Sequence, residues 1–112
     1  MAAAARRADV ALVVTEPTPF GLHDLAGACA VLRVLGVPAG VVLNKAQGGR
    51  GPVHEYCEAQ GLPLLLEIPM DPSLAESGAA GVALPAAWPE YGGVLHDLWV
   101  SCEALAAGRT AP

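Results

Sequence analysis

The feature that most constrains the fold is an apolar run from Val10 to Thr15 that a proline-rich segment ends. A continuous apolar run of this length is typical of a parallel β-strand buried on both faces. Glu16-Pro17-Thr18-Pro19 follows, and its two prolines exclude a helix there and favour an extended loop. The segment therefore predicts a buried strand that leads into a loop.

Helical and strand-like patterns alternate along the rest of the chain. Leucine and cysteine at spacings of three and four predict a helix from about Leu22 to Leu35, with Asp24 in its first turn and Gly36 as its stop. The other expected elements are a strand at 39–43 ending at Asn44-Lys45, a helix from Pro52 to before Gly61, a strand at 64–68, a short helix at 73–77, an irregular crossing at 78–88 and a helix at 89–107. This order predicts an α/β fold whose right-handed crossovers make the sheet parallel.

The length of 112 residues suits one domain with a modest core. We expect this single α/β domain over residues 9–107, with an N-terminal extension at 1–8 and a disordered tail at 108–112. Hydrophobic residues make up 54% and charged residues only 15% of the chain, which is rich in apolar residues for so small a domain. Apolar surface is therefore expected to meet a partner, or part of the fold is missing.

Charge and cysteine content exclude several classes of function. The net charge of −5 disfavours binding to nucleic acid or to an anionic membrane. No apolar run approaches the roughly 20 residues of a membrane-spanning helix. The three cysteines include no CxxC pair, which disfavours a disulfide framework and predicts a cytoplasmic protein.

Ligands of open parallel sheets bind beyond the carboxyl ends of the strands, where three segments carry polar residues. The segments are 15–19, 44–45 and 67–71. Around them, ADVALVVTEPTPFGLHDL, GVPAGVVLNKA and EYCEAQGLPLLLEIPMD occur in this order. The chain here resembles MinD/ParA-type P-loop ATPases, and most closely their branch with an inserted 4Fe-4S ferredoxin domain. The resemblance extends from Asp9 to Leu105 and implies a three-layer, partial P-loop NTPase fold with about three strands and four helices.

The resemblance also implies roles for single residues. Asn44 matches the residue whose amide recognises the adenine edge, a task that suits a carboxamide because it both donates and accepts hydrogen bonds. Pro69 and Asp71 match the segment that packs around the base. The expected cofactor-binding residues are Asn44, Lys45, Pro69, Asp71, Glu16 and Thr18. ATP or ADP is the implied cofactor; no catalytic residue and no metal ligand is expected.

The chain departs from this family in what it lacks. No GxxxxGK[ST] loop occurs, so no sequence element is expected to cradle phosphates, and the chain alone is not expected to hydrolyse a nucleotide. The acidic switch segment and the cysteine-rich ferredoxin insertion are missing too, so no iron-sulfur ligands are expected. The chain thus resembles only the C-terminal half, which would leave the Val10–Val14 edge unpaired. We expect this edge to pair with another copy or with a complementing N-terminal ATPase half.

Two other functions stay open: a non-enzymatic interaction module that uses the exposed sheet edge, and a small enzyme that uses Glu16 or Glu67. As an acid/base couple, these carboxylates lack a supporting nucleophile, and solvated loop positions are the favoured interpretation. The loop Gly48–Gly51 is favoured as a flexible connector over an anion nest. His54 and Cys57 are favoured as one partly exposed and one packed side chain over half a metal site. The aromatic residues Trp88, Tyr91 and Trp99 are expected to cover the sheet, with base stacking as a secondary role.

Overall fold

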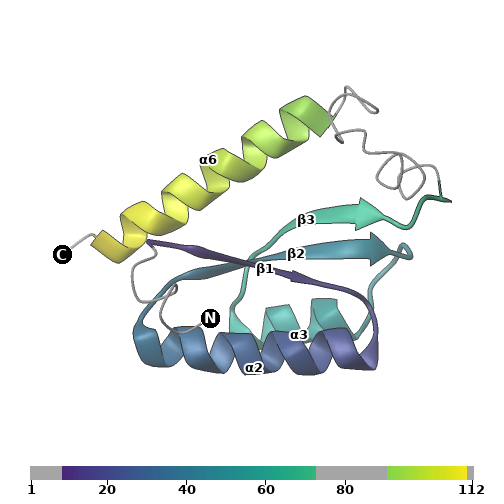
Figure 1. Ribbon diagram of the computed structural model, residues 1–112, viewed down its shortest axis with the longest axis horizontal. Coiled ribbons are helices and arrows are strands. Elements are labelled where there is room, and N and C mark those ends of the chain that lie inside the picture. Colours follow the sequence, from purple (N-terminus) through teal and green to yellow (C-terminus); the bar gives the residue numbers. More distant parts are fainter. Residues whose placement is uncertain (1–8, 73–90, 111–112) are drawn as a thin grey trace.

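A computed structural model describes residues 9–72 and 91–110. Its centre is a parallel sheet of β1 (Ala11–Thr15), β2 (Ala39–Ala46) and β3 (Leu64–Pro69), in the order β1-β2-β3 (Figure 1). The expected N-terminal extension, short helix at 73–77, crossing at 78–88, Trp88 and the last two residues lie outside the described residues.

Helices cover both faces of this sheet. Helices α2 (Pro19–Leu35) and α3 (Pro52–Gln60) lie on one face, and α6 (Tyr91–Thr110) crosses the other face (Figure 1). The chain is therefore a three-layer α/β protein, as the sequence predicts. Helix α6 continues to Thr110, beyond the expected end at Ala107. None of the helices in 9–72 and 91–110 is both long and apolar enough for a bilayer crossing.

The core lies between the sheet and the α2/α3 layer. Its buried members are Leu25, Cys29, Val41, Leu43, Ala46, Val53 and Cys57. The central strand β2 is buried from Ala39 to Leu43, which its continuous apolar sequence predicts. On the α6 side, Gly40 lies so close to Leu65 and Leu105 that a Cβ atom there would be 2.4 Å from Leu65 Cδ1. This glycine therefore lets α6 pack closely on the sheet.

The edge strand β1 is only half buried, so the prediction that both of its faces are covered is wrong. Val13 packs against the core, but Leu12 is 40% and Val14 is 64% exposed. Among the described residues helix α6 packs mainly on β2 and β3, and the side chains of Leu12 and Val14 on the same face of the sheet stay largely uncovered. Trp99 on α6 is 65% exposed and does not cover the sheet, contrary to expectation.

Helix α2 begins earlier than its apolar periodicity indicates. Thr18 adopts an extended conformation as N-cap, and Pro19 occupies the first turn, where a missing N–H costs nothing. Pro19 therefore starts the helix, although the sequence predicts a loop there, whereas Pro17 stays outside the helix. Asp24 consequently lies beyond the first turn, so the prediction that it belongs to the first turn is wrong. Gly36 ends the helix in the left-handed conformation, as predicted.

The buried thiols of Cys29 and Cys57 lead to a prediction. Burial raises the pKa of both, Arg33 partly offsets the rise at Cys29, and Cys29 adds to the rise at Cys57. Both are thus protonated at neutral pH, and we expect iodoacetamide to label them only as fast as the chain opens. Because the thiol pKa is higher in the folded chain, the free energy of unfolding should fall as pH rises above the ordinary thiol value of 9.0. Alkylation followed by mass spectrometry measures the labelling rate, and rapid labelling of the native chain would contradict the first prediction. Urea melts at neutral and alkaline pH measure the change in the free energy of unfolding.

Candidate functional site

A cavity of about 420 Å³ opens where β2 and β3 end. Its lining residues are Asn44, Lys45, Ile68, Pro69, Met70, Asp71 and Pro72. This volume lies within the roughly 300–1,000 Å³ that is usual for small-molecule sites. The cavity brings Asn44, Lys45, Pro69 and Asp71 together, whereas Glu16 and Thr18 lie outside its lining. Strand ends that are longer than expected supply these side chains, since Asn44 and Lys45 belong to β2 and Pro69 belongs to β3.

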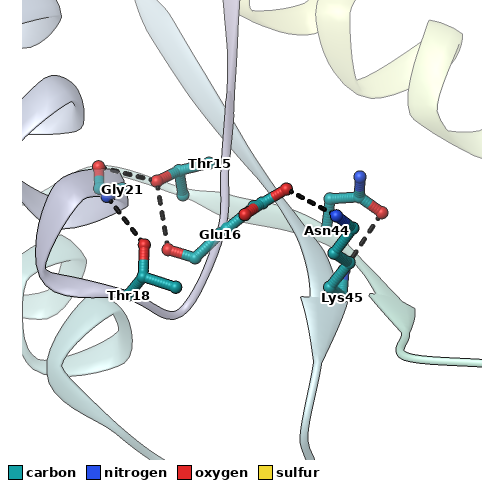
Figure 2. Close-up of polar contacts among 6 residues, drawn as sticks. All are labelled: Thr15, Glu16, Thr18, Gly21, Asn44 and Lys45. Carbon is teal, nitrogen blue, oxygen red and sulfur yellow. Dashed lines mark hydrogen bonds and ion pairs between the residues drawn. The ribbon is translucent and has the colours of Figure 1, made fainter.

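The Asn44 side chain is oriented by its neighbour. Its Oδ1 accepts a hydrogen bond of 3.0 Å from the backbone N–H of Lys45 (Figure 2). Lys45 has a φ of 56°, a left-handed conformation that costs a non-glycine residue roughly 1 kcal/mol. Within the described residues no other bond engages the amide, so its Nδ2 donors and one Oδ1 lone pair remain for a ligand.

An ion pair joins the ends of β1 and β2 beside this cavity. Glu16 Oε1 lies 3.1 Å from Lys45 Nζ, and both side chains are about half exposed (Figure 2). Glu16 is therefore a half-exposed loop residue, as the favoured interpretation has it, but its carboxylate has a partner in Lys45. Cross-strand pairs of this kind follow from sheet register, which places Thr15 beside Leu43.

A tight turn after β1 holds Glu16 in place. The buried Thr15 hydroxyl donates to the Gly21 carbonyl oxygen at 2.8 Å, and the Gly21 N–H donates to Thr18 Oγ1 at 3.0 Å (Figure 2). The Thr18 N–H donates to the Glu16 carbonyl oxygen at 2.8 Å. These bonds close the turn, so Thr18 caps α2 and does not contact the cavity.

A second cluster surrounds the glycine-rich loop before α3. The Gly51 N–H donates to His54 Nδ1 at 3.1 Å, which leaves the proton on Nε2 to donate to Glu67 Oε1 at 2.9 Å. Arg50 pairs with Glu58. The bond between His54 and Glu67 joins α3 to β3. Glu67 is exposed, as expected, but it lies within β3 and not in a loop, and its partner is His54 and not Glu16. The loop lines a cavity of only about 140 Å³.

The metal interpretation of His54 and Cys57 is also disfavoured by their positions. His54 faces Glu67, whereas Cys57 is buried in the core. Over residues 9–72 and 91–110, no group of three or more histidine, cysteine, aspartate or glutamate side chains is placed to hold a metal ion. His23 and His96 are exposed.

Sequence reasoning placed Thr15, Ile68 and Met70 in the candidate segments but did not predict that Thr15 builds the turn or that Ile68 and Met70 complete the cavity wall. It missed the role of Gly21 in the turn. The signal for Thr15 was a polar residue at the end of an apolar run. Gly21 gave a weaker signal, a glycine in the first turn of a helix. The pairing of His54 with Glu67 had no signal in the sequence.

Comparison with known proteins finds one informative relative. An iron-sulfur cluster carrier protein of Aquifex aeolicus (strain VF5) is 32% identical to this chain over 93 residues, covering 71% of the chain. The match covers 26% of the relative, so the chain corresponds to about a quarter of that protein's length. No protein-family profile matches the chain, and no solved structure matches it.

Proposed function

We propose that this chain forms the adenine-side wall of a nucleotide-binding domain of the MinD/ParA type, with its phosphate loop supplied from outside these 112 residues. The observation that carries the proposal is the cavity at the carboxyl end of the sheet. It joins Asn44 and Lys45 of β2 to Pro69 and Asp71 at the end of β3. Similarity to an iron-sulfur cluster carrier protein supports the same family.

The chemistry of the cavity suits an adenine ring. The free lone pair of Asn44 Oδ1 would accept from the exocyclic amine, and Nδ2 would donate to a ring nitrogen. Guanine carries an oxygen where adenine carries the amine, so this oxygen and Asn44 Oδ1, both hydrogen-bond acceptors, would face each other. Ile68, Pro69 and Met70 supply apolar surface for the ring faces.

In the described part of the chain β1 is an edge strand with no neighbour on its outer side, and this edge supports a partner. The Ala11 N–H donates to the Pro38 carbonyl oxygen, and in a parallel ladder alternate residues bond to the same neighbour. The backbone groups of Leu12 and Val14 therefore point away from β2, and their side chains are exposed. The partner is either a second copy or a complementing half that brings the phosphate loop.

A cytoplasmic iron-sulfur protein is the proposed context. All three cysteines are free and buried, which agrees with a reducing compartment. The relative's name concerns an iron-sulfur cluster, and the cluster ligands, like the phosphate loop, would come from the partner.

A non-enzymatic interaction module is the second candidate. The exposure of Leu12 and Val14 beside an open strand edge favours it, because the same surface serves a partner whether or not a nucleotide binds. Ligand binding at the cavity separates the two candidates.

The deciding experiment is an NMR titration of the full chain with adenosine and guanosine. We expect adenosine to shift the Asn44 side-chain amide signals, and the Asn44→Ala variant to bind adenosine about tenfold more weakly, since two hydrogen bonds are lost. Gln47→Ala is the matched control, because it removes an exposed carboxamide that lines the smaller cavity instead. Equal binding by both variants, or no adenosine-dependent shift, would contradict the adenine-wall proposal and leave the interaction module.

A further inference from the structure

We propose that this cavity, in the chain without a partner, binds an uncharged nucleoside more tightly than the corresponding nucleotide, because the Lys45 ammonium is already paired with the Glu16 carboxylate. The inference rests on the proposed adenine site. It states which class of ligand that site prefers and that Glu16 limits the binding of a phosphate. Its basis is the Glu16–Lys45 ion pair at 3.1 Å, on the rim of the cavity.

The charges around the cavity disfavour an anion. Among the lining residues within 9–72 and 91–110, Lys45 is the one cation, and Asp71 contributes a carboxylate. Glu16 offsets the charge of Lys45, and the chain as a whole carries a net charge of −5. A phosphate attached to a bound nucleoside would therefore find no available cation and would be repelled by the nearby carboxylates.

The two nearby helix N-termini are also engaged by protein groups. At α2, the Gly21 N–H donates to Thr18 Oγ1 and the Leu22 N–H to the Thr18 carbonyl oxygen. At α3, the Gly51 N–H donates to His54 Nδ1, and Glu67 lies on the other side of that ring. A phosphate at either helix would have to displace these bonds or approach a carboxylate.

The turn between β1 and α2 fixes the backbone from which Glu16 reaches Lys45. Its backbone carbonyl accepts from the Thr18 N–H at 2.8 Å, and Gly21 packs against the same carbonyl oxygen. An ordered backbone thus places the Glu16 carboxylate within reach of Lys45. Release of Lys45 for a phosphate requires the half-exposed Glu16 side chain to leave the ammonium.

The test compares the affinities of adenosine, AMP and ADP for the full chain, measured by the shift of the Asn44 side-chain amide at low and high salt. For the wild type we expect adenosine to bind most tightly and ADP most weakly, with differences that shrink at high salt. In Glu16→Gln, Lys45 is released, and the affinity ratio of AMP to adenosine should rise roughly fivefold. Glu58→Gln, which removes an exposed carboxylate paired with Arg50, should leave that ratio at the wild-type value.

The outcomes separate this inference from the proposed function. Tighter binding of AMP than of adenosine by the wild type, or an unchanged ratio in Glu16→Gln, overturns the inference while the adenine site stands. Binding of none of the three ligands overturns the adenine site and the inference with it. A rise of the ratio in both variants assigns the effect to general charge, which also overturns the role of Glu16.

Discussion

Replacement of Gly21 by alanine is expected to lower the free energy of unfolding by about 3 kcal/mol, the upper part of the usual range for overpacking. A Cβ atom at this position would lie 2.1 Å from the Glu16 carbonyl oxygen. Because that neighbour is backbone, no side-chain rotation relieves the clash. The turn must open, which breaks the bonds from Gly21 to Thr15 and Thr18. The buried Thr15 hydroxyl then loses its partner, which adds to the cost.

The same helix provides a matched control. Gly27 lies in the middle of α2, is exposed, and has nothing within 4 Å of an added Cβ atom. Gly27→Ala should therefore stabilise the chain by about 1 kcal/mol, because alanine favours a helix interior. Urea or thermal melts of the two variants should show changes of opposite sign in the free energy of unfolding, although both variants replace glycine by alanine. A Gly21→Ala chain as stable as the wild type would show that the turn is not closed as described.

Gly21 also illustrates why some of the site could not be predicted from sequence. A glycine near a helix start has several uses, and only the path of the preceding turn shows that Glu16 leaves no space for a side chain. The pairs Glu16–Lys45 and His54–Glu67 depend on how far each strand extends and on its register. Sequence patterns locate strand ends only to within a few residues, so they cannot predict which side chains form such pairs.

The elements themselves were largely predictable because their signals are local. The apolar run at 39–43 is continuous, and the strand there is buried on both faces. Gly36 and Gly61 both end helices in the left-handed conformation, which their positions after apolar periodicity indicate. The run at 10–15 is equally apolar, yet its strand is half exposed, since burial depends on where α6 crosses the sheet. Local pattern predicts that a strand forms, whereas its cover depends on the whole fold.

That uncovered strand leads to the second large expected effect, on association. Val14 is 64% exposed, and its backbone groups point away from β2, so it lies at the centre of the proposed partner surface. Val14→Lys should leave the fold intact and weaken self-association about a hundredfold, because pairing at this edge would have to bury an unpaired ammonium. Analytical ultracentrifugation over a range of concentrations measures the change.

Val34→Lys is the appropriate control for the partner surface. Val34 is 88% exposed on α2, so the substitution adds the same charge and removes the same apolar group at a distance from the β1 edge. We expect it to associate as the wild type does. Equal loss of association in both variants would assign the effect to net charge, and unchanged association in Val14→Lys would exclude the edge. If the wild type stays monomeric throughout, a second copy is excluded, and the complementing half remains the partner whose binding Val14→Lys should abolish.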